Sequence, residues 1–431
     1  MLSPNPLSLF CAVLLCFPLA LVFTISSNPS YIVTNIVSYN LVTPSPPPLP
    51  PLLSPPPPPP TIPSPPPPQP RPIVPPKIPT KKENTTTPTN KTTSKPPIIK
   101  QLSPPPPSLP EDDKEDVDLL KQASKVSPNL TKGHLKKVAF LFLTVSPLPF
   151  APLWEFYFNQ SGAGSTNTNK SKYNIYIHAD PNSRYDPPFT GVFSGRVIPS
   201  SKPTRRNTPT LITAARRLLS HALLDDPDNY MFILLSAACI PIHSFNFTYT
   251  KLVSSNKSFI EILSNETTAW GRWTARGESA MLPEVSFHDF RIGSQFWFLT
   301  RHHARVVVED VKLWRKFRLP CVTLGTCYPE ENYFPTLLSM VDPHNVVPAT
   351  LTNVNWRGRH DGHPRTYNAT EVDPGLIRWL REGRPRYGSV KINGSDLSVS
   401  HRWDPFLFAR KFAPNCVEPL LRIAKDFLFK D

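Results

Sequence analysis

Apolar and polar residues alternate in blocks through the larger, C-terminal part of the chain. Residues 137–146 read KVAFLFLTVS, a nearly continuous apolar run with β-branched and aromatic side chains, which is typical of a strand buried on both faces. Comparable runs at 173–179, 192–198 and 230–236 predict further strands, and an amphipathic helix is expected at 210–224. This order predicts an α/β domain with a largely parallel sheet.

The pattern continues with further elements toward the C-terminus. We expect a strand at 294–300 and helices at 301–314, 330–340, 373–382 and 415–429. The helix at 373–382 begins with Asp-Pro, a cap followed by an N1 proline, and the helix at 415–429 begins with a capping-box spacing. Ligands of parallel sheets bind beyond the carboxyl ends of the strands, so the loops after the first, second and fourth strands are the first places to look for a site.

The N-terminal part has a different pattern. Residues 7–25 carry no charge and are long enough to cross a bilayer as a helix. We favour an uncleaved anchor over a cleaved signal peptide, because no Lys or Arg precedes a long apolar run, but both remain open. Much of the chain's content of 58 prolines lies within 44–107, in Ser-Pro runs that resemble plant extensin-like segments. Such runs form extended, semi-rigid spacers.

Composition narrows the compartment and the partners. The formal net charge of +15 favours an anionic ligand, a nucleotide diphosphate or nucleic acid, and entry into the secretory pathway argues against nucleic acid. Four cysteines of the domain permit two disulfides or buried free thiols, and their pairing is open: Cys239, Cys321, Cys327 and Cys416. Glycosylation sequons fit a luminal surface and lie at Asn84, Asn90, Asn129, Asn159, Asn169, Asn246, Asn256, Asn265, Asn368 and Asn393.

No motif predicts a catalytic metal. Metal-dependent nucleotide-sugar transferases place Asp-x-Asp directly after a buried strand, whereas the strand at 230–236 is followed by Ala-Ala-Cys. Asp226 and Asp228 spell the tripeptide but precede that strand, at the other end of the sheet, where we expect a solvated turn. No histidine or cysteine cluster has zinc spacing, and His302 and His303 are expected to point different ways on a helix surface.

Several strings together resemble one family. In order they read LSAACIPI, GSQFWFLTR, YPEENYFPTLL, NWRGRHDGHPRTY and FLFARKFAP, at 235–242, 293–301, 328–338, 355–367 and 406–414. The set resembles the plant branch of the core-2/I-branching β-1,6-N-acetylglucosaminyltransferase family, over about 131–431. The resemblance implies a GT-A-type, Rossmann-like fold with a mostly parallel central sheet. It also implies a UDP-sugar donor, inversion at the anomeric carbon, and no cofactor or divalent metal.

The resemblance assigns the catalytic base to Glu331. An inverting transfer needs one general base for the acceptor hydroxyl. Taken alone, Glu331 reads as an exposed acid at a helix N-terminus. Its neighbour Glu330 points about 100° away on a helix, so the two do not form a hydrolase-type pair.

The resemblance also implies fixed cations for the donor diphosphate. Lys411 matches the family's lysine, and Arg402, Arg386 and Arg410 are all candidates for its partner arginine. For each arginine, a solvated basic surface is the alternative.

Further contacts are expected for the nucleotide and the acceptor. His178 and Asp180 close an early strand and are candidates for the nucleotide, with a strand-ending turn as the alternative. Trp356, Arg272 and Trp273 are candidates for the acceptor, with a core position as the alternative for each tryptophan. The chain departs from the plant pattern at 204–209, 214–215 and position 332, around the expected donor and base.

We therefore expect a single-pass type II Golgi membrane protein. It would have a cytoplasmic tail at 1–6, an anchor at 7–25, a disordered proline-rich luminal stem at 26–130 and a catalytic domain at 131–431. It would transfer a sugar, N-acetylglucosamine among the candidates, from a UDP-sugar to a glycan or glycoprotein acceptor. Two alternatives stay open. One is an inactive carbohydrate-binding or scaffold protein of the Golgi or cell wall, and the other is a wall glycoprotein whose stem is the working part.

Overall fold

The computed structural model describes residues 113–130, 133–160, 168–358, 362–388 and 402–431. None of the helices in these ranges is long and apolar enough to cross a bilayer. The expected tail and anchor, and most of the expected stem, lie outside the described residues.

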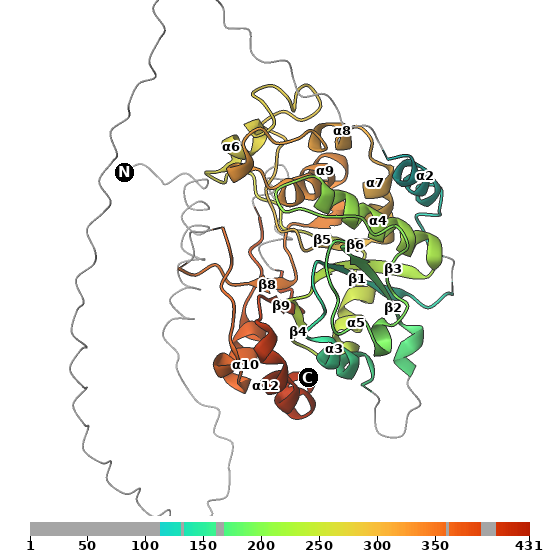
Figure 1. Cartoon of the computed structure of the whole chain (residues 1–431), viewed down its shortest axis with the longest axis vertical. Coiled ribbons are helices and arrows are strands. Elements are labelled where there is room, and N and C mark those ends of the chain that lie inside the picture. Colours follow the sequence, from blue (N-terminus) through green and yellow to red (C-terminus); the bar gives the residue numbers. More distant parts are fainter. Residues whose placement is uncertain (1–112, 131–132, 161–167, 359–361, 389–401) are drawn as a thin grey trace, which may run out of the picture. The chain divides into compact units, whose positions relative to one another are not determined.

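A six-stranded sheet forms the centre of the domain, in the order β2-β1-β3-β6-β5-β7 (Figure 1). Its strands are β1 Lys137–Thr144, β2 Tyr173–Ala179, β3 Asn229–Ser236, β5 Ser258–Phe259, β6 Phe298–Thr300 and β7 Val346–Val347. β1 pairs in parallel with β2 and β3, and β5 with β7, whereas β6 runs antiparallel to both of its neighbours. The α/β class and the mostly parallel sheet are confirmed, and the arrangement fits a GT-A-like fold.

Helices cover both faces of this sheet (Figure 1). Successive side chains of β1 alternate between two cores, because strand residues point to opposite faces: Phe140 and Phe142 enter one core, Leu141 and Leu143 the other. The first core also contains side chains of α3 Ala151–Phe158 and α5 Phe245–Ser254. The second contains side chains of α4 Thr210–Asp225, α7 Arg301–Glu309 and α9 Tyr333–Val341.

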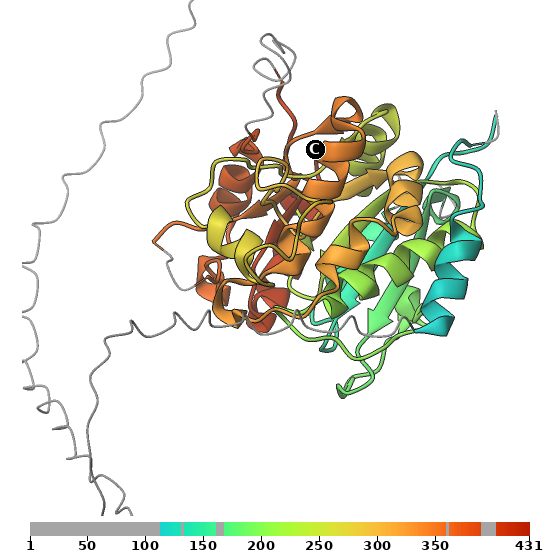
Figure 2. The same cartoon turned by 90° about the horizontal axis from the view of Figure 1, so that it is seen from above.

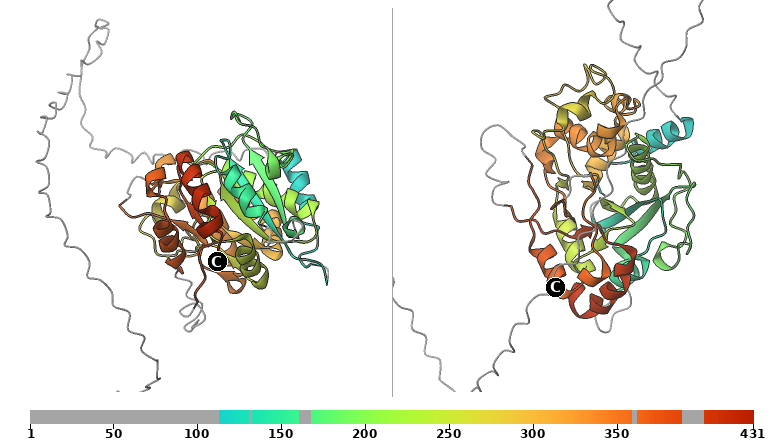
Figure 3. Two further views of the ribbon diagram at one scale, coloured as in Figure 1. Left: turned by 90° about the horizontal axis from the view of Figure 1, so that it is seen from below. Right: turned by 60° about the vertical axis from the view of Figure 1, so that its left-hand side comes forward.

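A second, three-stranded sheet has the order β4-β9-β8. Its strands are β4 Ile240–Pro241, β8 Thr352–Val354 and β9 Phe408–Arg410. α10 Pro374–Glu382 and α12 Val417–Ile423 add side chains to the first core, and Figure 3 shows these C-terminal helices side by side. A π-helical turn, Ala424–Leu428, follows α12, and Arg381 of α10 donates to its Leu428 carbonyl at 2.8 Å.

The helix α2, Lys114–Ala123, belongs to the globular unit (Figure 2). It packs on α4 and α7, and Ala123 is part of the second core. Arg217 of α4 donates to both carboxylate oxygens of Asp116, at 2.6 and 2.5 Å. The helix α2 lies within the range expected as stem, 26–130, and is held onto the domain by a partner 101 residues away that its own acidic sequence does not reveal.

Several expected elements differ from the structure; among them, the helix expected at 415–429 is divided into a 3-10 turn, α12 and the π-helical turn, and the strand expected at 294–300 is shortened to β6. The expected strand at 192–198 is wrong: a 3-10 turn, Gly191–Phe193, precedes a single bridge from Val197 to Ile177, and Gly195 in between has φ +68°, which breaks extended structure. The helix expected at 301–314 ends at Glu309 and resumes as α8 Trp314–Phe317, because Asp310 accepts the backbone N–H groups of Leu313 and Trp314.

The helix expected at 330–340 is divided into a 3-10 turn, Pro329–Glu331, and α9.

The Asp-Pro start of α10 is confirmed, since Asp373 accepts the N–H of Leu376 at 2.7 Å. A short helix, α6 Ala269–Thr274, was not predicted.

Cysteine pairing is resolved in the described domain. Cys321 and Cys327 form a disulfide, and Cys239 and Cys416 are buried free thiols. One of the two possible disulfides therefore exists, and it closes the loop just before Glu331.

Candidate active site

A cleft of about 1020 Å³ opens at the carboxyl edge of the central sheet. Glu261 follows β5 and Thr350 follows β7, whereas Phe296 precedes β6, which runs in the opposite direction. Asn353 of β8 and Arg410 of β9 form the wall on the side of the second sheet. The cleft therefore lies at the edge predicted from the strand order, but beside β5, β6 and β7 rather than at the predicted loops after β1, β2 and β3.

Glu331 lines this cleft, and its carboxylate is held by Arg272. The Nη1 group of Arg272 donates to Oε2 of Glu331 at 2.7 Å, and the guanidinium lies 4.6 Å from the ring centre of Tyr328. The side chain of Glu331 is 28% exposed. Two residues from separate segments of the chain, α6 and the turn before α9, thus meet in one ion pair inside the cleft.

Gly293 brings a third segment against Glu331. Its N–H donates to the Glu331 carbonyl at 2.8 Å. A Cβ at this position would lie 1.9 Å from the carbonyl oxygen of Glu261, so only glycine permits this approach. This close packing places the segments that carry Glu261 and Glu331 side by side.

Glu330 faces a different environment from its neighbour. It is 4% exposed, and its Oε2 atom has no hydrogen-bond partner among the described residues. Burial, with the charge of Glu331, raises the pKa of Glu330 to about 7. The two adjacent glutamates therefore do not act as a matched pair on one bond.

Glu261 is a cleft residue that the sequence analysis missed. Burial raises its pKa to about 7, the charges of Glu266 and Glu331 act in the same direction, and Arg386 opposes them. One signal was available: a single acid inside the apolar run FIEIL is costly to bury unless it faces a polar site.

The positive charges of Arg410, Lys411 and Arg206 repel one another near the cleft. Arg410 lines it, with its guanidinium carbon 4.2 Å from the ring centre of Phe296, and its buried Nε has no hydrogen-bond partner in the described part of the chain. Burial lowers the pKa of Lys411, and the charges of Arg410 and Arg206 lower it further. No carboxylate forms an ion pair with Arg410 or Lys411 among the described residues, although the charge of Glu331 raises the pKa of Arg410 and so partly offsets the repulsion from Arg206.

The other two arginine candidates have carboxylate partners. Arg402 donates to both oxygens of Asp404, at 2.8 and 2.9 Å, and does not line the cleft. Arg386 lines the cleft but pairs with Glu266 at 2.6 Å. The geometry thus favours Arg410 over both as the partner of Lys411.

His178 and Asp180 hold a loop of the protein itself. The Nε2 atom of His178 accepts the N–H of Lys202 at 3.2 Å, and Asp180 accepts the N–H and hydroxyl of Thr204 at 2.7 and 2.9 Å. Burial lowers the pKa of His178 to about 4, so its imidazole is neutral at pH 7. Neither residue lines the cleft. Both fix the segment that carries Arg206, a residue the sequence analysis did not select.

Two tryptophans present exposed faces at the cleft. Trp356 and Trp379 both line it and are 50% and 40% exposed. Trp273 instead lies in the second core, where its indole N–H donates to the Val285 carbonyl at 3.1 Å. Of the two tryptophans selected from the sequence, the structure brings only Trp356 to the cleft, and it adds Trp379.

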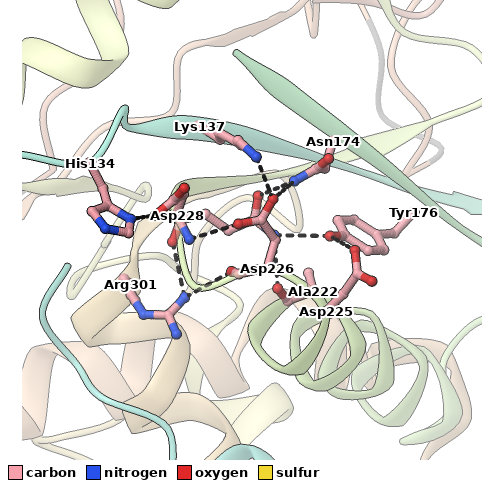
Figure 4. A network of polar contacts seen from close by, with 10 residues as sticks. His134, Lys137, Asn174, Tyr176, Ala222, Asp225, Asp226, Asp228 and Arg301 are labelled. Carbon is pink, nitrogen blue, oxygen red and sulfur yellow. Dashed lines mark hydrogen bonds and ion pairs between the residues drawn. The ribbon is translucent and has the colours of Figure 1, made fainter. Parts of the chain in front are cut away.

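The Asp226-x-Asp228 tripeptide lies at the opposite, amino edge of the sheet (Figure 4). Asp226 accepts from Lys137 at 2.7 Å and from Asn174 at 2.8 Å, and Asp228 pairs with His134 at 2.7 Å. The prediction that this tripeptide lies at the end of the sheet away from the site is confirmed. The turn is less solvated than predicted, because protein donors occupy these carboxylates.

The prediction that His302 and His303 lie on the surface is wrong for one of them. His303 is fully buried, whereas the His302 side chain is 54% exposed. With Asp342 they form a cluster of three potential metal ligands outside the cleft.

Comparison with known proteins gives two matches. The family model described as Core-2/I-Branching enzyme matches residues 138–381. Over 307 residues the chain is 29% identical to a protein named glycosyltransferase BC10 from Oryza sativa subsp. japonica, an alignment that covers 64% of this chain and 73% of that protein. The family match includes Arg272, Glu331 and Trp356, while Arg410 and Lys411 lie beyond its end.

Proposed function

Because the chain belongs to the core-2/I-branching enzyme family and is a glycosyltransferase, we propose that its cleft catalyses inverting, metal-independent sugar transfer from a UDP-sugar to a glycan or glycoprotein. The observation that carries this proposal is the position of Glu331, an oriented carboxylate in a cleft that also contains Arg410, whose buried Nε has no hydrogen-bond partner among the described residues.

Glu331 acts as the general base. It takes the proton of an acceptor hydroxyl while that oxygen forms a bond to the anomeric carbon, and the bond from that carbon to the diphosphate oxygen breaks. Attack from the face opposite the leaving group inverts the configuration. The 2.7 Å bond from Arg272 orients the carboxylate for this transfer.

The departing UDP carries the negative charge that develops in the reaction. Lys411, Arg410 and Arg206 stabilise it in our proposal, because cations that are already held in place need little reorganisation during the reaction. Their mutual repulsion supports this assignment, since a bound diphosphate would relieve it. His178 and Asp180 contribute indirectly, by holding the loop of Arg206.

The acceptor binds at the part of the cleft that contains Trp356 and Trp379. Their exposed faces suit stacking on sugar rings, and the carboxyl group of Glu261 offers a hydrogen-bonding group at the same cleft. We include N-acetylglucosamine among the candidate transferred sugars.

The N-terminal layout is part of the same proposal. We propose a type II Golgi membrane protein with a cytoplasmic tail at 1–6, an anchor at 7–25 and a proline-rich luminal stem. In sealed Golgi vesicles, added protease should remove an N-terminal tag and leave a C-terminal tag intact. Loss of the N-terminal tag during biosynthesis would indicate a cleaved signal peptide instead.

An inactive carbohydrate-binding protein is the second candidate, and one observation favours it: Arg272 already occupies the carboxylate of Glu331. A donor screen separates the two. The full-length protein in mild detergent is incubated with a panel of UDP-sugars and a glycan acceptor mixture in EDTA, and free UDP is measured. The enzyme releases UDP from at least one donor, and the release is lost in Glu331→Gln but kept in Glu309→Gln, an exposed glutamate of α7. Release that requires a divalent metal would overturn the metal-free mechanism, and binding without release from any donor would favour the second candidate.

A further inference from the structure

His302, His303 and Asp342 converge at a point remote from the cleft. The Nε2 atoms of His302 and His303 lie 3.4 and 3.3 Å from the same oxygen, Oδ2 of Asp342. All three atoms lie within 4.8 Å of one another. One carboxylate oxygen thus faces two imidazoles of consecutive residues.

These separations are longer than those of the chain's close histidine–aspartate hydrogen bonds, although the 3.3 Å contact between His303 and Asp342 is itself within hydrogen-bond range. His134 with Asp228, and His243 with Asp431, are each 2.7 Å apart. Around Zn²⁺, nitrogen and oxygen ligands lie about 2.0–2.2 Å from the metal, so neighbouring ligands of a tetrahedral site are about 3.3–3.5 Å apart. The two distances to Asp342 therefore equal two edges of such a site.

Neighbouring groups orient these ligands. Ser258 Oγ lies 2.6 Å from Nδ1 of His303 and accepts the backbone N–H of Thr300 at 2.8 Å. The Nδ2 group of Asn345 contacts both oxygens of Asp342, at 3.1 and 3.0 Å. Metal-binding histidines and carboxylates commonly have hydrogen-bonded support from outer-shell groups. Here Ser258 contacts the ring nitrogen of His303 that is not a proposed ligand, whereas Asn345 contacts both the free oxygen of Asp342 and the proposed ligand oxygen, Oδ2.

The cluster is also open on one side. His303 is fully buried and Asp342 is 19% exposed, whereas the His302 side chain is 54% exposed. An ion could enter past His302 and complete its coordination with water. Two imidazoles and one carboxylate suit Zn²⁺, Co²⁺ or Ni²⁺ rather than Ca²⁺ or Mg²⁺, which prefer oxygen ligands.

The topology separates this cluster from the catalytic cleft. His302 and His303 follow the C-terminal end of β6, His303 contacts the first residue of β5, and Asp342 precedes β7. These three positions lie at the amino edge of the parallel strands, whereas Glu261 and the rest of the cleft lie at the carboxyl edge.

We propose that His302, His303 and Asp342 bind one divalent transition-metal ion of the Zn²⁺ type, in a structural site outside the catalytic cleft. The ion ties the first turn of α7 to the C-terminal end of α9, the helix whose N-terminal end follows Glu331. The proposal does not depend on the proposed function, because no cleft residue is a ligand.

The test uses the full-length protein, purified in detergent without a polyhistidine tag, treated with chelator and then freed of it. CoCl₂ is titrated in, and the visible ligand-field absorption of bound Co²⁺ is recorded before displacement by ZnCl₂. We expect one equivalent of Co²⁺ with the intense absorption of a low-coordinate site. Since loss of an outer-shell partner alone weakens metal binding about 10–100-fold, loss of a ligand in His302→Ala should weaken it at least about 10-fold.

His288→Ala is the matched control. His288 is 92% exposed and lies 3.4 Å from Asp289, a similar separation but without a second imidazole. We expect this variant to bind Co²⁺ as the wild type does, and Zn²⁺ to raise the melting temperature of both but not of His302→Ala. Equal melting of the three apo proteins verifies that His302→Ala folds. Absence of the Co²⁺ spectrum in the wild type, or equal binding by His302→Ala, would overturn the proposal, and so would several weak equivalents with no defined site.

Discussion

Asp116 provides the most quantitative test of where the folded domain begins. Its carboxylate receives two bonds from Arg217, at 2.6 and 2.5 Å, and the two side chains are only 10% and 7% exposed. In Asp116→Asn the shape is kept but the charge of Arg217 is left buried without a counter-charge. Removing one partner of a buried pair costs about 3–5 kcal/mol, and we expect the lower end, since asparagine still accepts one hydrogen bond.

The assay is thermal unfolding of the full-length protein, followed by intrinsic tryptophan fluorescence. At about 2–4 °C per kcal/mol, a loss of about 3 kcal/mol lowers the melting temperature by about 6–12 °C. Glu115→Gln is the matched control on the same helix. Its carboxylate lies 2.8 Å from Lys202 but is 63% exposed, so its loss costs about 0–1 kcal/mol.

The outcome decides whether α2 is part of the domain. If Asp116→Asn melted within about 2 °C of Glu115→Gln, less than 1 kcal/mol would separate them, and the burial argument would be refuted. The expected stem boundary near residue 130 would then stand.

Three further predictions follow from other described residues. Burial raises the pKa of Glu330 from 4.5 to about 7, so the folded protein holds this proton more tightly than the unfolded chain. The free energy of unfolding should therefore fall by up to about 3 kcal/mol as the pH rises from about 4.5 to about 7. In Glu330→Gln this contribution is lost, and the plot of melting temperature against pH should be flatter over that range. Lys411→Met should weaken inhibition by UDP at least about 10-fold, as expected for lost charged hydrogen bonds, whereas Arg402→Met should leave the inhibition constant unchanged. Cys321→Ser should lower the free energy of unfolding by about 2 kcal/mol because the disulfide to Cys327 closes a short loop, and a non-reduced digest of the wild type should contain the linked peptide.

The sequence predicted the central strands well because their burial is continuous. β1, β2 and β3 lie within about a residue or two of the expected ranges, since long apolar runs with β-branched residues leave few alternatives. The expected strand at 192–198 failed because Gly195 has a positive φ that hydrophobicity does not report. Similarly, α7 ends early because Asp310 caps the next turn.

Long-range partners explain most of what was missed. His303 reads as a surface residue until Ser258 and Asp342 are seen against it, 45 and 39 positions away. Asp116 reads as part of a solvated acidic patch until Arg217 is known to cover it. Local patterns carry no information on such pairings.

The candidate site was predicted only as far as the family resemblance reached. That resemblance selected Glu331, Arg410 and Trp356, which the structure brings to one cleft, although their catalytic roles stay predictions. Glu261 offered only the weak signal of an acid inside an apolar run, and Arg206 has no distinctive motif; chain folding brings Glu261 into the cleft and the charge of Arg206 near Lys411.

The role of Glu331 as general base is the central claim, and one comparison tests it most directly. Donor affinity, from calorimetry with the UDP-sugar that supports turnover, and the turnover rate in EDTA are measured for the wild type and Glu331→Gln. The account predicts a turnover rate at least about 100-fold lower, as for a lost general base, with donor affinity kept within about threefold. Turnover that persists in Glu331→Gln, or donor affinity lost together with turnover, would contradict it.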